Sequence, residues 1–383
     1  MINFSFTKEQ LMIQNAVRKF AEKELLPKYS LCDQEEKFPS EQWEKMCEMG
    51  IHGMGVPSEY GGQPVDYVTK GLTAKELARG DVNCAYAVSL APTNEIFSKY
   101  ANEELKKDWL PEVAKGKKIL ALSVTEPHCG SDVAALKAKA EKKDGYYILK
   151  GEKSSITFAM DCAAALVFAK TNPEAKARGV SCFFVPTDTP GVTRQPYKDM
   201  GTRAARRGSI FLDDVQIPEQ YVIGEENQGF YQVMDAFDVI RVLLSMQALG
   251  AAEKSLEETM DYVKERTAFG RPLATFEGVS FPLAESYTKI MAAQWLCYHA
   301  LWMHDQGLKH TKETAMCKYL CPKLAVDVIH DCLVLHGHYG YARDFPFEQR
   351  LRDVMGFEFA DGTANIQKII IARELMGRES LPY

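Results

Sequence analysis

Two changes of residue pattern along the chain constrain its fold more than any other feature. Up to about residue 118 the sequence has helical periodicity. From about 119 to 228 it consists of short runs rich in β-branched and aromatic residues, separated by Asp-Gly and Pro-Gly turns. A helical pattern then returns. We therefore predict a mainly helical protein with a β middle domain, divided into domains at 1–118, 119–228 and 229–383.

The periodicity also places individual elements. Thr7 and Gln10 have the form of a helix capping box. Further helices of the first domain are expected at 72–77 and 101–107. Strands are expected at 119–124, 146–149, 164–169, 180–185 and 209–215. The last domain should contain helices at 230–266, 281–306, 311–335 and 364–376. Helices this long with apolar faces favour a bundle, which often completes its core by oligomerising.

Composition excludes several classes of protein. The chain has 383 residues, a net charge of −6 and no long basic run, which argues against nucleic acid as the main partner. It has no apolar run of about 18 residues, so we expect no membrane span. The first residues lack a signal-peptide pattern. The ten cysteines form no CxxC pair, and buried thiols in a reducing cytoplasm are the favoured interpretation.

Common catalytic and nucleotide-binding motifs are missing from the sequence. It has no Gly-x-Gly-x-x-Gly after a strand, which argues against a Rossmann site. It also lacks Gly-x-Ser-x-Gly, a P-loop and His-Glu-x-x-His. Cys317 and Cys321 are four residues apart on an expected helix, but no further ligands at metal-site spacing join them. We predict no metal site.

A block at the end of an expected strand, 123–132, is rich in small and hydroxyl-bearing residues. Such residues offer backbone N–H and hydroxyl donors to a flat heteroaromatic ring. The same composition also suits a turn that binds nothing. A second strand, 153–157, reads Lys-Ser-Ser-Ile-Thr.

Two later blocks combine glycine with cationic or imidazole side chains. In 264–273, Arg266 could form bidentate bonds to a phosphate, while Gly270 could simply cap a helix. In 335–341, Gly337 and Gly340 are interspersed with two histidines and two tyrosines. His336 and His338 suggest a metal, but no third ligand is visible in the sequence, and His338 also suits a phosphate.

Two segments of the last domain carry acidic groups. Phe237, Asp238 and Arg241 share one expected helix, where Asp238 and Arg241 could also form an intrahelical pair. Near the C-terminus, Arg352-Asp353 is followed after seven residues by Asp361-Gly362-Thr363.

These blocks, in this order over nearly the whole chain, resemble the acyl-CoA dehydrogenase family. The resemblance implies an N-terminal helical domain, a central β-barrel-like domain and a C-terminal four-helix bundle. It implies FAD as cofactor, an acyl-CoA substrate, an electron-transfer flavoprotein as acceptor, a homotetramer and a cytoplasmic location.

The resemblance also carries residue roles. It assigns cofactor contacts to Val124, Thr125, Ser131, Thr157, Arg266, Phe269, Gly337 and Thr363. It assigns substrate contacts to Ser131, Phe237, Asp238, Arg241 and Gly362. Arg266 and Phe269 would reach the FAD of a neighbouring subunit. Asp361 stands where the family has its catalytic glutamate, and Ile240 stands at the family's alternative base position, where it cannot serve.

The sequence departs from the family pattern at several positions. Ser155 replaces a tryptophan that borders the flavin, and Glu277, Val334 and His338 replace residues of the FAD-binding blocks. Asp361 is one methylene shorter than glutamate, which withdraws the carboxylate by roughly 1.5 Å, about one C–C bond. This shortening favours a substrate that brings its α-carbon closer, such as an alicyclic (cyclohexanecarboxyl-CoA-like) or α-branched acyl-CoA.

Other functions stay open at this point. They include a straight-chain acyl-CoA dehydrogenase, an enzyme of 1,4-elimination on a cyclohexenecarboxyl-CoA, an enoyl-CoA reductase, an acyl-CoA oxidase and a decayed acyl-CoA-binding scaffold. A 1,4-elimination needs a second base, and the segment 86–91, which we expect to line the pocket, has no carboxylate. That segment also has no arginine for a dicarboxyl substrate such as glutaryl-CoA.

Overall fold

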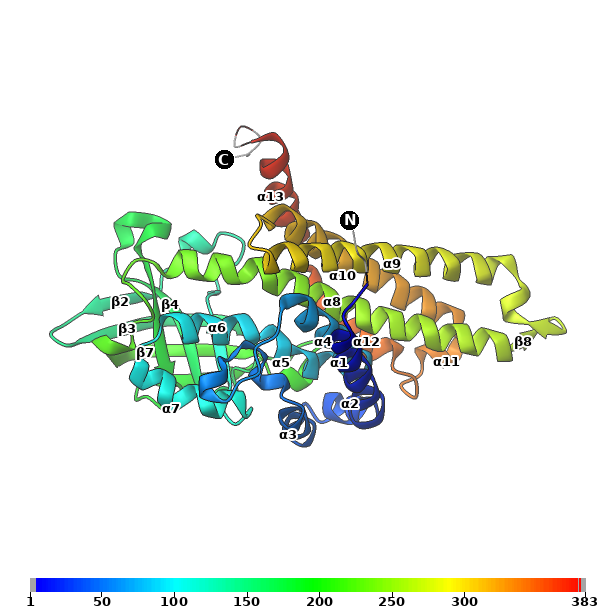
Figure 1. Ribbon diagram of the computed structural model, residues 1–383, viewed down its shortest axis with the longest axis horizontal. Helices are drawn as coiled ribbons and strands as arrows, with labels where there is room; N and C mark the ends of the chain where they lie inside the picture. The colour runs from blue at the N-terminus through cyan, green and yellow to red at the C-terminus, as the bar shows by residue number, and fades with distance from the viewer. Residues whose placement is uncertain (1–4, 378, 380–383) are drawn as a thin grey trace.

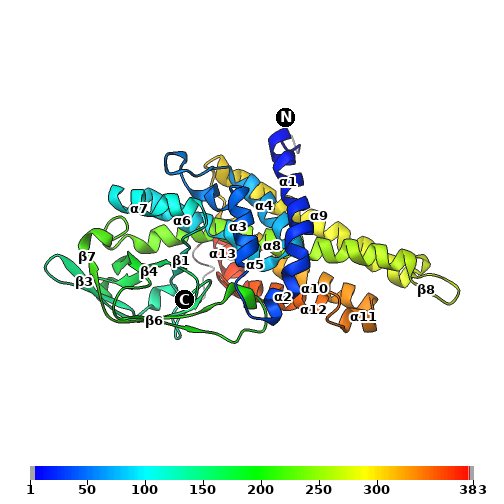
Figure 2. The ribbon, with the colours of Figure 1, turned by 90° about the horizontal axis from the view of Figure 1, so that it is seen from below.

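The computed structural model describes residues 5–377 and 379. A helical part, a curled β-sheet and a second helical part follow one another along the chain, as predicted. Figures 1 and 2 show the sheet at one end of an elongated molecule and a helical hairpin projecting at the other. No helix among residues 5–377 is long and apolar enough to cross a membrane.

The N-terminal part consists of helices that cover α8 and one side of the sheet. The capping box at Thr7 is confirmed, since its hydroxyl accepts from the Gln10 N–H and the Gln10 side chain accepts from the Thr7 N–H. The helices are α1 (Lys8–Phe20), α2 (Leu26–Gln34), α3 (Ser40–Glu48), α4 (Tyr67–Gly80), α5 (Val82–Ser89), α6 (Ala91–Tyr100) and α7 (Glu103–Ala114).

The middle part is one mixed sheet whose main path runs β1-β4-β2-β3-β7-β6, with β5 paired to β4. Its strands are β1 (Leu120–Ser123), β2 (Lys139–Lys142), β3 (Tyr146–Ile156), β4 (Ala164–Lys170), β5 (Val180–Pro186), β6 (Val192–Pro196) and β7 (Gly208–Pro218). β1 pairs parallel with β4, and β3 pairs antiparallel with β7. β1 also contacts β3 and helix α6.

The C-terminal part is built on three long helices. Its elements are α8 (Gly229–Glu265), the short strands β8 (Thr267–Ala268) and β9 (Arg271–Pro272), α9 (Glu277–Asp305), α10 (Thr311–Leu335), α11 (His338–Tyr341), α12 (Phe347–Met355) and α13 (Ala364–Met376). Gly250 lets α8 pass close to α4, since a Cβ there would lie 2.2 Å from the Lys75 carbonyl oxygen.

The sequence missed β2 and β6 and divided β3 into two strands, at 146–149 and 153–157. β2 has one buried residue of four, Ala140, and β6 has none, so neither carries the alternation that marks a half-buried strand. The expected helix at 101–107 begins only at Glu103, where Asn102 caps it by accepting from the Leu105 N–H. The expected helices at 311–335 and 364–376 are confirmed with those bounds.

A buried carboxylate ties the parts together beside the candidate site. Asp353 of α12 is fully buried and accepts from the Tyr29 hydroxyl at 2.6 Å and the Thr202 N–H at 2.5 Å. The Asn83 amide donates to it at 3.4 Å. Burial raises the pKa of Asp353 from 3.8 to about 7, although the hydrogen bonds from Tyr29 and Thr202 oppose the rise.

This raised pKa predicts a pH dependence of stability. The folded state holds the Asp353 proton up to about pH 7, whereas the unfolded chain releases it near 3.8. The folded state therefore binds more protons in this window, and stability should fall as pH rises from about 4 to about 7.

We expect melting temperatures measured between pH 5 and 8 to decrease across this range, and Asp353→Asn to reduce the slope. Asp81, whose pKa burial raises to about 6, should keep part of the slope in the variant. An equal slope in both proteins would contradict this prediction.

Candidate active site

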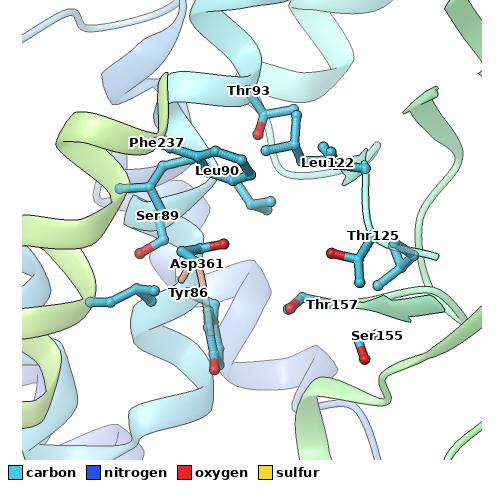
Figure 3. A pocket seen from close by; sticks show the side chains of 14 residues that line it. Tyr86, Ser89, Leu90, Thr93, Leu122, Thr125, Ser155, Thr157, Phe237 and Asp361 are labelled. Carbon is cyan, nitrogen blue, oxygen red and sulfur yellow. The ribbon is translucent and has the colours of Figure 1, made fainter. Parts of the chain in front are cut away.

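The candidate site is a pocket between the helices and the ends of two strands. Its cavity of about 110 Å³ is lined by α5, α6 and α8, by residues at the ends of β1 and β3, and by Asp361. Figure 3 shows Thr125, Thr157 and Ser155 on one side of an open space, with Asp361, Ser89 and Tyr86 on the other.

The local backbone aims the Asp361 side chain into this pocket. Asp361 has a left-handed φ of 51° and is followed by Gly362 with φ 99°. The next residue, Thr363, caps α13, since its hydroxyl accepts from the Ile366 N–H at 3.4 Å. A helix start and two left-handed residues thus fix the direction of the carboxylate.

The Asp361 carboxylate is unpaired. It has no hydrogen bond or ion pair with any residue from 5 to 377, and Asp361 is half-buried in the pocket lining. Burial raises the pKa of this carboxyl above its ordinary value, and the nearby cations of Lys318 and Arg241 oppose the rise. A half-buried, unpaired carboxylate of raised pKa is suited to removing a proton.

Three side chains hold the Asp361 segment through its carbonyl groups. Arg241 Nε donates to the Asp361 oxygen at 3.3 Å, and Gln367 Nε2 donates to the Asp361 and Gly362 oxygens at 3.3 and 3.1 Å. Lys318 Nζ donates to the Phe357 and Gly362 oxygens at 2.5 and 3.3 Å. These donors orient the segment while leaving the carboxylate free.

Arg241 is itself held by a polar chain. Its Nη1 donates to Asp238 at 2.8 Å, and the other oxygen of Asp238 accepts from the Thr311 hydroxyl at 2.7 Å. The sequence therefore anticipated the Asp238–Arg241 pair. In this structure Arg241 contacts the backbone of Asp361.

The backbone N–H of Asp361 also lacks a partner. No carbonyl or side chain in the described part of the protein accepts from it. An unpaired N–H beside an unpaired carboxylate places a donor and a base at one residue. Such a donor can stabilise an oxygen on which negative charge develops.

The opposite wall is fixed by a buried ion pair. Lys153 of β3 donates to Glu126 at 2.7 Å and to the Val124 carbonyl at 2.9 Å. Glu126 also accepts from the N–H groups of Lys137 and Ala138 at 2.6 and 2.9 Å. Together these bonds hold the end of β1 against β3, which brings the Thr125 and Thr157 hydroxyls to the same wall of the pocket.

Glu126 also belongs to a group of possible metal ligands with His128 and Cys129. The Lys153 ammonium already supplies a cation to Glu126, and two backbone N–H groups occupy its other lone pairs. We therefore interpret this group as structural.

Ser155, which replaces the family's tryptophan, adopts a left-handed φ of 59°. Its N–H donates to the Tyr197 hydroxyl at 3.2 Å, and Tyr197 shares a 2.9 Å hydrogen bond with Ser209. Tyr197 thus brings an aromatic ring from the segment after β6 close to Ser155.

The structure brings some of the residues predicted from sequence together and separates others. Lining the pocket are Val124, Thr125, Thr157, Phe237 and Asp361. Behind Asp361 lie Asp238, Arg241, Gly362 and Thr363. Ser131 lies outside the pocket, in an exposed turn after β1. Ile240 does line the pocket, so an apolar side chain occupies the alternative base position.

Arg266, Phe269 and Gly337 lie at the other end of the helical part. Arg266 and Phe269 belong to the β8–β9 hairpin at the tip of α8 and α9 (Figure 1), and Gly337 lies at the end of α10. The Phe269 side chain is 96% exposed, and Gly337 has φ 60° with open space around it. Within one chain these residues cannot reach the pocket.

His336, in the same block as Gly337, is a core residue. It is buried, stacks on Tyr262 with ring centroids 4.1 Å apart and bonds to the Cys332 carbonyl at 2.9 Å. This packing accounts for His336 without a metal.

Sequence reasoning found one wall of the pocket and missed other residues. The segment 86–91 was predicted to line it, and Tyr86, Ser89 and Leu90 do. Lys318 was missed, although a lysine on the buried face of α10 was a usable signal because lysine is rarely fully buried without partners. Gln367 gave no such signal.

Comparison with known proteins identifies the chain. Its residues 7–117, 121–215 and 227–376 match the N-terminal, middle and C-terminal domain models of acyl-CoA dehydrogenases. It is 37% identical to an acyl-CoA dehydrogenase of Bacillus subtilis (strain 168), over 97% of this chain and 99% of that protein. The chain belongs to the acyl-CoA dehydrogenase family.

Two further similarities concern redox direction and electron acceptors. The chain is 35% identical to an acryloyl-CoA reductase (NADH) of Anaerotignum propionicum, over 98% of this chain and 97% of that one. It superposes with TM-score 0.94 and 31% identity on a chain of the structure described as the electron transferring flavoprotein of Acidaminococcus fermentans, covering 98% and 100% of the two chains.

FAD is the cofactor of this family, and the residues present fit it. The Thr125 and Thr157 hydroxyls have no partner within the described residues and line the wall opposite Asp361, where they can bond to a flat polar ring. Arg266 has no ion pair within the described residues and can bind a phosphate. The predicted FAD-dependent oxidoreductase acting on acyl-CoA is confirmed at the level of the family.

Lys318 generates a prediction about the pH dependence of activity. Burial lowers the pKa of Lys318 to about 8, so it is charged at neutral pH and lowers the pKa of Asp361. Lys318→Met should move the acidic limb of the kcat/KM profile for flavin reduction to higher pH. It should also lower kcat by on the order of 10- to 100-fold, because the Asp361 segment loses a support.

Lys318→Arg is the matched control, since it keeps a cation at the same position. A methionine variant whose acidic limb stays at the wild-type pH would show that Lys318 does not act on Asp361.

Proposed function

We propose that this protein transfers hydrogen between the α- and β-carbons of a short or compact acyl-CoA, with Asp361 as the proton-transferring base. The observation that carries the proposal is the unpaired, half-buried carboxylate of raised pKa facing the two threonines across the pocket. When bound, FAD supplies the hydride acceptor. The residues of the chain orient the acyl group and move the proton.

The thioester can be held by the same residue that acts as base. The thioester carbonyl oxygen would accept a hydrogen bond from the unpaired Asp361 N–H. This bond would stabilise the enolate that forms as the α-proton leaves. The apolar side chains of Phe237, Ile240 and Leu244 exclude water from the carboxylate. This exclusion supports the raised basicity of Asp361.

A reductive direction is a second candidate. The similarity to an acryloyl-CoA reductase supports it, since the same base can return a proton to the α-carbon. The non-enzymatic scaffold is not favoured, because the base, its supports and the threonine wall are all present.

Replacing Asp361 by Asn tests the assignment. The amide has nearly the same size and tolerates the left-handed backbone but cannot remove a proton. We expect purified Asp361→Asn to retain FAD, seen as flavin absorbance, and to lose flavin reduction by acyl-CoA by at least about 10³-fold. Reduction at the wild-type rate would falsify the role of Asp361.

A complete FAD site requires a second copy of the chain. Phe269 and Arg266 project from a hairpin and lie far from their own pocket, and a phenylalanine that is 96% exposed indicates a surface covered by a partner. We infer that the hairpin of one subunit and Gly337 complete the FAD site of another. A homotetramer, the predicted assembly, provides such neighbours.

An electron-transfer flavoprotein remains the proposed acceptor. The similarity to a chain in the Acidaminococcus fermentans structure supports it. Arg203, Arg206 and Arg207 would give a cationic surface near Ser155, but each lies within 4 Å of an aspartate. We therefore interpret these arginines as a structural turn.

The acyl group is proposed to be compact. The flavin ring proposed at the threonine wall shares this cavity of about 110 Å³, so the space left beside Asp361 suits a few carbon atoms better than a long fatty chain. The ring-bearing or α-branched acyl group inferred from the short Asp361 side chain stays a prediction, since the relatives described above are not named for such substrates.

A panel of acyl-CoAs tests this prediction. Butyryl-, isobutyryl-, cyclohexanecarbonyl- and octanoyl-CoA would be compared by anaerobic bleaching of the bound flavin. We expect the two substrates substituted at the α-carbon to bleach it faster than octanoyl-CoA by at least about tenfold. Fastest bleaching by octanoyl-CoA would contradict both the compact pocket and the preference for α-substituted substrates inferred from the short Asp361 side chain.

A further inference from the structure

A row of hydroxyl groups lines one wall of the pocket. Tyr86 and Ser89 of α5 and Thr93 of α6 are spaced i, i+3 and i+7, so successive helical turns present them on the same face. Leu90 joins the two helices in a helical conformation, which keeps the spacing intact. The part of the lining that α8 contributes, beside this row, is apolar: it consists of Phe237, Ile240 and Leu244.

Tyr86 ends in the pocket without a partner. Its ring packs edge-on against Phe158 and Phe357, with centroids 6.1 and 5.8 Å away. Its hydroxyl has no hydrogen bond to any described residue. Burial raises the pKa of Tyr86, so the phenol stays protonated and can donate.

Ser89 has a proton available for the pocket. Gln247 Nε2 donates to the Ser89 oxygen at 2.5 Å and to the Ala85 carbonyl at 3.2 Å. The serine is therefore the acceptor in this pair, and its own O–H is free to donate elsewhere. Thr93, which is 1% exposed, likewise has no hydrogen bond to a described residue.

Hydroxyl donors in a pocket that is otherwise lined by apolar side chains on this side are unfavourable once water leaves, unless a ligand pairs with them. A hydrocarbon acyl chain would displace water from Tyr86, Ser89 and Thr93 and leave all three unpaired. An oxygen on the acyl chain would accept from the hydroxyl of the row that lies next to it. A site built with such donors discriminates against the analogue that lacks the polar group.

We propose that this hydroxyl row binds an oxygen atom carried by the acyl chain, so that the preferred substrates are short acyl-CoAs with a hydroxyl or carbonyl group. The oxygen lies beyond the α- and β-carbons, since these are the reacting atoms. This inference rests on the function proposed above for the same pocket.

The test compares two thioesters that differ by one oxygen, butyryl-CoA and 4-hydroxybutyryl-CoA, on the FAD-loaded enzyme. The measured quantity is the ratio of kcat/KM for flavin reduction, hydroxylated over plain. We expect a ratio of at least about 10 in the wild type and a ratio near 1 in Tyr86→Phe.

Two further variants sharpen the result. Tyr60→Phe removes a phenol that bonds to Glu103 on the surface, and it should keep the wild-type ratio. Thr93→Val removes a second hydroxyl of the row with little change of shape, and it should lower the ratio even if Tyr86→Phe does not fold.

The outcomes separate the two proposals. A wild-type ratio near 1, as expected if only water fills the row, overturns the inference while leaving the dehydrogenase function standing. An elevated ratio that survives in both Tyr86→Phe and Thr93→Val also overturns it. Flavin reduction by neither thioester nor any other acyl-CoA overturns the proposed function, and the inference falls with it.

Discussion

The candidate site depends on hydrogen-bond donors that bind backbone carbonyl groups around Asp361 and do not bind its carboxylate. Arg241, Gln367 and Lys318 all bond to carbonyl oxygens of the segment that carries Asp361, the proposed base. A donor aimed at the carboxylate would stabilise its charge and lower its basicity. Hydrogen bonds to the carbonyl groups fix the position of the carboxylate without lowering its basicity. The two nearby cations act on the carboxylate only through space, and burial outweighs them.

A buried ion pair and a buried carboxyl group also position the rest of the pocket. The Lys153–Glu126 pair fixes the strand ends that carry the threonines, and Asp353 fixes α12 just before the base segment. Removing one member of such a pair leaves an unpaired charge in the interior, which is more costly than never having had the pair. These interactions therefore specify the relative placement of the helical and β parts more than they add to net stability.

The sequence predicted the order of the parts and most long elements because buried helices and strands carry strong periodic patterns. It missed β2 and β6, whose charged or exposed residues lack such a pattern. Of the site, it anticipated Asp361 and the Asp238–Arg241 pair. It missed Lys318 and Gln367, because their partners are carbonyl groups, which every residue has and no motif records.

The proposed contacts between subunits can be found neither from the periodicity of the sequence nor from the structure of a single chain. Arg266, Phe269 and Gly337 were predicted from the resemblance alone, and a single chain leaves them far from the pocket. The predicted domain boundaries, likewise, stay predictions.

The left-handed backbone at Asp361 bears on how this site could change. Aspartate and asparagine occupy that conformation more readily than residues with longer side chains. The short side chain of Asp361 therefore suits the left-handed turn that carries it. A longer acid at this position would extend the carboxylate further but would fit the left-handed backbone less well. Redesign toward a longer acid would therefore have to change the loop between α12 and α13 as well. A substitution at position 361 by itself is a poor starting point.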